Sequence, residues 1–212
     1  MNNNNLFSKI FAWLAVGLFI SFGVGYYIST NVNLMSQIFD KYFIWIILEL
    51  AFAFGLSFFI RKLSKTMTIV LYILYCITTG LTFSSIFVVY EISSIMLVFL
   101  VTAIVFALLA IYGYFTNKDI TKIGNLLLFG LLGIIILTVI NFIFKSSSFD
   151  LLLTIISIII FMGFIIYDIH IIKRKLYDIE EDKLVVYGAF QLYLDFINLF
   201  LDLLRLFGKS ND

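Results

Sequence analysis

Four acidic residues that interrupt otherwise apolar stretches are the side chains of this sequence best suited to chemistry. Glu49, Asp168, Asp195 and Asp202 each lie well inside a run long enough to cross a bilayer. A charged side chain in hydrocarbon costs at least about 2.5–3.5 kcal/mol, so acids in such places usually face a water-filled path, pair with one another or carry protons. We therefore take these four carboxyl groups as candidates for handling ions or protons.

The most regular polar pattern lies in the last apolar segment. Gln191, Asp195, Asn198, Asp202 and Arg205 follow one another at spacings of four, three, four and three residues, which places them on one face of a helix. Such a stripe is expected to be kept away from lipid, because each polar group there needs a partner. Two interpretations stay open: a polar seam that packs this helix against its neighbours, or an ion or proton path.

Asp168 and Asp195 are expected near the same side of the membrane. Asp168 precedes the basic cluster Lys173–Lys175 by five residues, and Asp195 lies about eleven residues into the helix that returns from that side. At about 1.5 Å of rise per residue their depths are roughly 8 and 16 Å, and a shift of a few residues brings them level. Two carboxyl groups that meet in a dry setting tend to share one proton. The spacing allows a pH sensor for the neutral range without requiring one.

Three further residues bear on such a site. Arg61 ends the second apolar segment on the same side, where it could hold a carboxylate pair or serve as an ordinary anchor beside Lys62 and Lys65. Glu49, near the middle of its segment, is either an acid on an ion path or a protonated residue bonded to a neighbouring helix. His170 is the single histidine and could titrate near neutral pH, although a structural role at the interface is the expectation.

The elements that must position these residues are membrane-spanning helices. Of the 212 residues, 63% are apolar and 13% charged, whereas soluble domains have about 45–50% apolar and about 25% charged residues. Seven segments reach the roughly 20 mainly apolar residues that a bilayer core requires: 8–29, 42–60, 67–89, 94–115, 123–144, 150–172 and 185–207. Short loops separate them, so consecutive helices should be antiparallel neighbours. The sequence predicts an all-α integral membrane protein, with residues 1–212 forming a single seven-helix domain in the lipid bilayer.

The first apolar segment carries two signals of its own. The run that follows Lys9 continues to about Ile28 without a cleavage site of small residues, so we expect it to be kept as a helix. Within it Gly17, Ser21 and Gly25 recur at every fourth position. Small residues at this spacing let two helix backbones approach closely, although the pattern is also common by chance. It is consistent with a packed bundle.

Lysine and arginine are distributed unevenly between the two sides of the membrane. With the amino terminus in the cytosol, ten of the fourteen fall on the inner side and four on the outer side. The inner set is Lys9, Arg61, Lys62, Lys65, Lys118, Lys122, Lys173, Arg174, Lys175 and Lys183, and the outer set is Lys41, Lys145, Arg205 and Lys209. The positive-inside rule then predicts an inner (plasma) membrane protein with a cytoplasmic amino terminus and an extracytoplasmic carboxyl terminus.

Several other kinds of chemistry find no support in the sequence. A formal net charge of +1 gives no sign of a nucleic-acid partner, and the single cysteine, Cys76, excludes an intramolecular disulfide or a thiolate metal cluster. Metal-ligand spacing, a phosphate-binding glycine loop and a nucleophile–base arrangement are also missing. We therefore expect no metal site, no cofactor and no enzymatic activity.

Two stretches of the last two segments are characteristic of a known family. The first is Gly163-Phe-Ile-Ile-Tyr167-Asp168. The second is Ala189-Phe-Gln-Leu-Tyr193-Leu-Asp195-Phe-Ile-Asn198-Leu-Phe200, followed by Leu204-Arg205 and Gly208. Together they resemble the Bax inhibitor family (transmembrane Bax inhibitor motif proteins), and the length and short tails resemble a bacterial member. Ile169 departs from the pattern, since many members have threonine after Tyr-Asp, which bears on local hydrogen bonding but not on the aspartates.

The resemblance implies a bundle whose seventh helix is central and wrapped by the other six, and a pH-sensitive calcium leak. The proton-sharing pair would then be Asp168 and Asp195, with Arg61 as a latch reaching them from the second helix. Calcium and protons would be the partners, with Ca²⁺ as the permeating ion and not a cofactor. The further candidates for the ion path are Glu49, Gln191, Asn198 and Asp202.

Two alternative functions stay open. Some relatives of this kind act by binding and restraining other membrane proteins, including proteases. A secondary transporter that exchanges calcium for protons would use the same acids as a leak channel.

Overall fold

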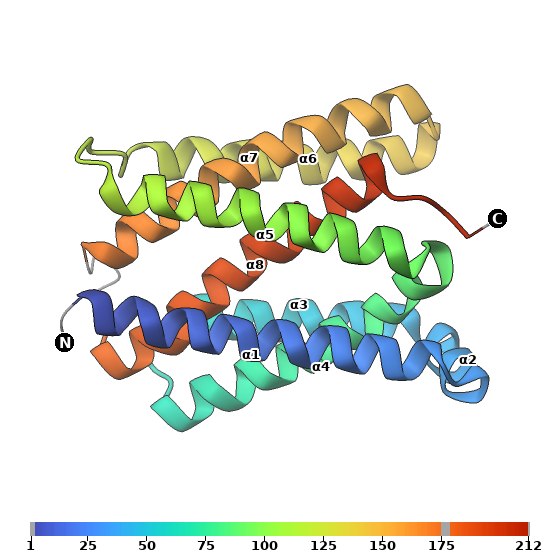
Figure 1. The fold of residues 1–212 in the computed structure, drawn as a ribbon, viewed down its shortest axis with the longest axis horizontal. Helices are drawn as coiled ribbons and strands as arrows, with labels where there is room; N and C mark the ends of the chain where they lie inside the picture. Colours follow the sequence, from blue (N-terminus) through green and yellow to red (C-terminus); the bar gives the residue numbers. More distant parts are fainter. Residues whose placement is uncertain (1–2, 175–178, 212) are drawn as a thin grey trace. The chain divides into compact units, whose positions relative to one another are not determined.

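The computed structural model describes residues 3–174 and 179–211 (Figure 1). Lys175 of the inner basic set and the carboxyl-terminal Asp212 lie outside the described residues. The described residues form eight α-helices: α1 (Asn3–Ser29), α2 (Val32–Asp40), α3 (Tyr42–Phe59), α4 (Lys65–Val89), α5 (Ile92–Phe115), α6 (Ile123–Phe144), α7 (Ser147–Lys173) and α8 (Glu181–Phe207). All except α2 are long and apolar enough to cross a membrane. The predicted all-α fold with seven spans is therefore confirmed.

Local capping explains why several helices begin outside the predicted apolar ranges. Ser64 accepts a hydrogen bond from the Met67 amide and starts α4. Ser146 does the same for the Phe149 amide and starts α7. A side-chain oxygen at this position satisfies one of the amides that the first helical turn leaves unpaired. These polar caps lie outside the apolar runs, so hydropathy alone places the helix starts too late.

Helix α2 corrects the prediction of a polar loop between the first two spans. Asn31 accepts hydrogen bonds from the amides of Asn33 and Leu34, and so begins a helix of 9 residues. Met35 is its buried residue. A helix this short gains its stability from packing and a good cap more than from its own hydrogen bonds.

The first of two compact units holds α1, α2, α3, α4 and α8 as far as Tyr193. Its tightest crossing joins α1 to α4, where a Cβ atom added at Gly25 would lie 3.1 Å from the carbonyl oxygen of Gly80. The ring of Tyr75 on α4 packs edge-on against both Phe190 and Tyr193 of α8. Small residues therefore bring the backbones of α1 and α4 together, and edge-on contacts between aromatic rings hold α8 beside α4.

The second compact unit holds α5, α6, α7 and α8 from Leu194 onward. Gly113 of α5 meets the backbone of α7, since a Cβ atom there would lie 2.7 Å from the carbonyl oxygen of Ile166. Phe99 and Phe106 of α5 both pack against Phe196 of α8. These contacts fix α5 against the two helices that carry Asp168 and Asp195.

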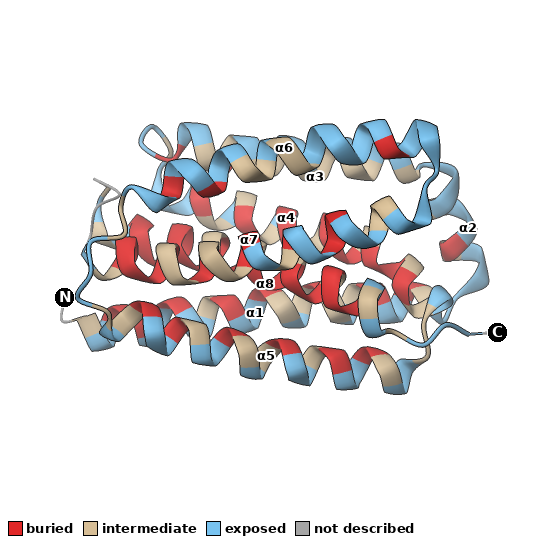
Figure 2. Cartoon of the chain, turned by 90° about the horizontal axis from the view of Figure 1, so that it is seen from above, coloured by how far each residue is buried: buried red, intermediate tan, exposed pale blue. Residues whose placement is uncertain are grey.

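Helix α8 takes part in both units and is the most buried of the spans. In its most apolar window 78% of the residues are buried, against 6% for α3 and 11% for α6. Figure 2 shows buried residues along α8 and mainly exposed ones on α6. The predicted central role of the seventh span is thus confirmed, and the apolar surfaces of α3 and α6 imply contact with a lipid bilayer. A single domain over the whole chain stays a prediction.

Contacts at the helix ends establish which segments share a side of the membrane. The Asn211 side chain donates hydrogen bonds to the carbonyl oxygens of Val88 and Tyr90, so the carboxyl-terminal tail lies at the end of α4. At the opposite ends of these helices, Lys65 at the start of α4 bonds Asp182 at the start of α8. In each of these two contacts, an even number of membrane crossings must separate the two segments along the chain, as the seven-span prediction requires.

Candidate functional site

Asp168 and Asp195 are neighbours within the second unit. Each is only 4% exposed, and the carboxyl group of Asp168 lies close enough to that of Asp195 for a hydrogen bond between them. The helices that bear them are held by close packing, since Ile165 and Ile169 flank Asp168 and are almost fully buried. A carboxylate only accepts hydrogen bonds, so a bond between two carboxyl groups requires a proton on one of them. The spacing in the sequence allowed the carboxyl groups of Asp168 and Asp195 to lie side by side, and in the structure they do.

One carboxyl oxygen of this pair, Oδ2 of Asp195, is buried without a hydrogen-bond partner among the residues that the structure describes. Most buried polar atoms in proteins are satisfied, so an exception at an acidic pair is a place where a proton, a water molecule or a cation can be accepted. The arrangement can therefore exchange a proton and present oxygen ligands.

Asp202 lies two turns beyond Asp195 and is also buried, at 8% exposed. Its carboxyl group accepts a hydrogen bond from the hydroxyl of Ser157 on α7. Asn198, between the two aspartates, donates its amide to the Leu194 carbonyl of its own helix. The stripe is thus turned inward at Asp195 and Asp202, as expected. Arg205, in the last turn of α8, is exposed, and its separation from lipid stays a prediction.

Glu49 belongs to the first unit, where it bonds α3 to α4. Its two carboxyl oxygens accept hydrogen bonds from the hydroxyls of Thr79 (2.7 Å) and Thr82 (3.2 Å). Tyr75, one turn before Thr79, is a further hydrogen-bonding neighbour. The three hydroxyls follow at spacings of four and three on α4, the same signal that marked α8, so sequence reasoning had the means to find them. Glu49 is thus bonded to a neighbouring helix, and its place on an ion path stays a prediction.

The remaining candidates lie in different places. Gln191 also belongs to the first unit, and among the described residues its buried side-chain oxygen has no hydrogen-bond partner. Arg61 lies in the exposed turn between α3 and α4 of that unit, and its action as a latch stays a prediction. His170 is 1% exposed, and neither of its ring nitrogens is hydrogen-bonded within the described residues. That burial favours a packed, structural histidine over an exposed titrating one.

The arrangement of potential metal ligands is a further feature of these acids. Within the part of the chain that the structure describes, no three histidine, cysteine, aspartate or glutamate side chains gather to hold an ion. Of the four acids inside the spans, Glu49 and Asp202 each bond hydroxyl groups, and Asp168 and Asp195 form a pair.

The fold and these sites define a multi-pass helical membrane protein with acids buried between its spans. Residues 3–212 match the family described as "Inhibitor of apoptosis-promoting Bax1". The chain is 39% identical over 211 residues to "Inner membrane protein YbhL" of Escherichia coli K12, covering 95% of this chain and 90% of that protein. It is 36% identical over 217 residues to an uncharacterized protein of Borreliella burgdorferi, covering 99% and 94%. The chain belongs to the Bax inhibitor family.

Proposed function

We propose that this protein is a pH-sensitive calcium leak channel, gated by the proton that Asp168 and Asp195 share. The observation that carries the proposal is the contact between two buried carboxyl groups on α7 and α8. Such a pair exists in at least two protonation states that differ by a full charge in a setting of low polarity, where charge is expensive. A change of pH therefore acts directly on the helix packing around the pair.

Calcium suits the other acids of the proposed path. Ca²⁺ takes carboxylate, carbonyl and water oxygens in a flexible shell, and passes more readily between sites that do not bind it too tightly. Asp202 with Ser157, and Glu49 with Thr79 and Thr82, supply such oxygens on two pairs of helices. Gln191 and Asn198 complete the proposed set of path residues. No enzymatic step is part of this proposal.

The gate is proposed to open as pH falls. With the pair deprotonated, its negative charge favours a bond to the guanidinium of Arg61, which would hold the second spanning helix in place. A proton gained by the pair weakens that bond and leaves the helix able to move. Arg61 therefore acts as a latch whose hold depends on the charge of the aspartates.

Calcium flux into liposomes that contain only the purified protein tests the function. A leak predicts flux down a calcium gradient, faster at pH 6 than at pH 8, with no flux in protein-free liposomes. Uphill flux driven by a proton gradient would make the protein an exchanger. The absence of flux in either mode would contradict the channel and favour a protein that binds and restrains other membrane proteins.

We further propose that the chain lies in the inner membrane with its amino terminus in the cytoplasm. The name of the Escherichia coli relative supports the location, and the distribution of lysine and arginine supports the orientation. A reporter fused after Asp212 is expected to be active only outside the cytoplasm, and one inserted between Lys175 and Lys183 only inside. If both reporters lay on the same side of the membrane, the proposed orientation and the prediction of seven spans would be contradicted.

A further inference from the structure

Lys183 is an unusual residue for the place where it lies. It belongs to the first turn of α8, where the helix dipole disfavours a positive charge, and it is only 6% exposed. The neighbouring Glu181 and Asp182 are the residue types that this end of a helix favours. A buried ammonium group in an unfavourable dipole needs specific partners to be retained.

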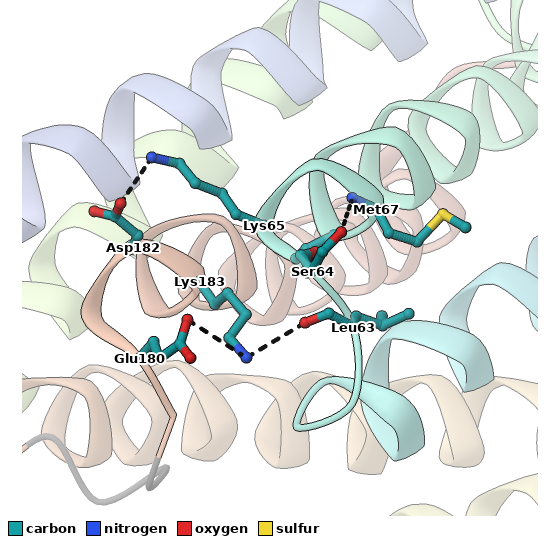
Figure 3. A network of polar contacts seen from close by, with 8 residues as sticks. Leu63, Ser64, Lys65, Met67, Glu180, Asp182 and Lys183 are labelled. Atoms are coloured by element: carbon teal, nitrogen blue, oxygen red, sulfur yellow. Dashed lines mark hydrogen bonds and ion pairs between the residues drawn. The ribbon is translucent and has the colours of Figure 1, made fainter.

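The partners of Lys183 lie in the turn between α3 and α4 and just before α8. Its Nζ atom donates to the carbonyl oxygen of Leu63 at 3.3 Å and lies 3.8 Å from a carboxyl oxygen of Glu180 (Figure 3). The turn is otherwise closed by its own backbone, since the amides of Lys62 and Leu63 both donate to the Phe59 carbonyl. The ammonium group of Lys183 therefore ties this turn to the first turn of α8.

A second contact joins the same two segments but differs in exposure. Lys65 donates to Asp182 at 2.9 Å, with 55% and 71% of the two side chains exposed. Exposed ion pairs of this kind contribute little, because water and salt screen them. The side chain of Lys183 is 8% exposed, so its hydrogen bond to Leu63 is poorly replaced by water. Of the two contacts, the one made by Lys183 is the one able to hold the turn.

We propose that Lys183 is a positioning residue for Arg61. Arg61 lies two positions before Leu63 in the turn that Lys183 holds, and α8 runs from Lys183 to Asp195 without a break. Lys183 thus fixes the position of the turn that bears Arg61 relative to α8, the helix that bears Asp195. This inference rests on the proposed function, in which Arg61 latches the aspartate pair.

The surroundings of Lys183 bear several other charges. Lys9 of α1 lies near Asp182, and Arg61, Lys62 and Lys65 come from the held turn and the start of α4. Glu180, Glu181 and Asp182 balance them at the start of α8. Glu180 is itself 79% exposed, so Leu63, which is half-buried, is the less exposed partner. A change of Lys183 therefore acts mainly on the turn and not on the balance of exposed charges.

The experiment compares Lys183→Met, which keeps the chain length and removes the ammonium group, with the matched control Lys65→Met. Hydrogen–deuterium exchange of residues 60–64 reads the turn independently of flux. We expect exchange there to rise on the order of tenfold in Lys183→Met, the factor that loss of a hydrogen bond to a charged group corresponds to. Lys65→Met is expected to change it by less than about threefold, since exposed pairs are weak.

The pH profile of calcium flux is the second readout. Lys183→Met is expected to displace the profile in the same direction as Arg61→Met, and to add nothing further in an Arg61→Met background, because residues that act through one another are not additive. Lys183→Arg, which keeps a charged donor, is expected to restore most of the wild-type profile. Should Lys183→Met fail to insert, Lys183→Gln keeps a donor for Leu63 without the charge and is expected to show a smaller displacement.

The outcomes separate this inference from the function on which it rests. Unchanged exchange in residues 60–64 overturns the positioning role. A wild-type pH profile of calcium flux in Lys183→Met also overturns the positioning role. If Asp195→Asn changes the profile in the same experiments, the proposed leak channel is still supported. Additive effects of Lys183→Met and Arg61→Met overturn the action through Arg61. A wild-type protein without calcium flux overturns the proposed function and this inference together.

Discussion

Calcium flux through the Asp195→Asn protein is expected to lose most of its pH dependence between about pH 6 and 8, a range that the titration of buried carboxyl groups can reach. Asparagine keeps the shape of the side chain but has no carboxyl group to titrate. A hydrogen bond between the carboxyl groups of Asp168 and Asp195 requires a shared proton, whereas the amide of asparagine supplies a donor at every pH. The variant should therefore insert and fold, with most of the proton sensitivity of its gate lost. Asp168→Asn is expected to behave in the same way.

Asp119 provides the matched control for these variants. It lies in the loop between α5 and α6, where the hydroxyl and the amide of Thr121 donate hydrogen bonds that hold the pKa of the Asp119 carboxyl below its usual range. A carboxyl group with a lowered pKa stays ionised throughout the range from about pH 6 to 8. Asp119→Asn thus removes one negative charge without removing a titration in this range, and its flux should keep the wild-type dependence on pH.

The result that would end the pair's role as sensor is a wild-type pH profile in both Asp168→Asn and Asp195→Asn. The pair would then be a structural bond between α7 and α8. The sensor would have to be sought first at His170, where His170→Gln flux measurements would follow. Flux that rises with pH in the wild-type protein would leave the sensor in place but reverse the proposed direction of the gate.

The sequence predicts the spans well and their partners poorly, for a physical reason. A bilayer imposes a minimum length and an apolar composition on each span, and both can be read one segment at a time. Helix α2 obeys no such constraint, since its 9 residues depend on the cap at Asn31 and on packing of Met35. Hydropathy alone therefore does not distinguish this helix from a polar loop.

In the candidate site, too, features of a single helix were predictable and contacts between helices were not. Helical spacing placed Asp195 and Asp202 on one face, and both are buried. Whether Asp168 meets Asp195 depends on the relative depth of two helices, and an error of a few residues at about 1.5 Å each exceeds the length of a hydrogen bond. The partners Thr79 and Thr82 of Glu49, and the burial of Lys183, depend likewise on which helices pack together. Those contacts arise from the assembled chain and have no signature in a single segment.

The crossing of α1 and α4 gives the largest expected effect on stability. A Cβ atom at Gly80 would lie 2.7 Å from the Cβ atom of Val24 and 2.9 Å from the carbonyl oxygen of Ser21. Both atoms belong to or adjoin the α1 backbone, so no rotation of a side chain relieves the clash. Ser21 also bonds the carbonyl of Cys76 and the hydroxyl of Tyr193, so a shift of α1 disturbs α4 and α8 as well.

Gly80→Ala is therefore expected to lower the free energy of unfolding by about 1–3 kcal/mol, the usual cost of overpacking a close contact. The matched control is Gly23→Ala on α1, where a Cβ atom would meet no atom within 4 Å. The control should be as stable as the wild type or slightly more stable, because alanine favours the helix. Thermal unfolding of the three proteins in the same detergent measures the difference. Equal midpoints for Gly80→Ala and Gly23→Ala would mean that α1 and α4 do not approach as closely at Gly80 as the structure has them, and that the stripe of Gly17, Ser21 and Gly25 does not serve a tight crossing.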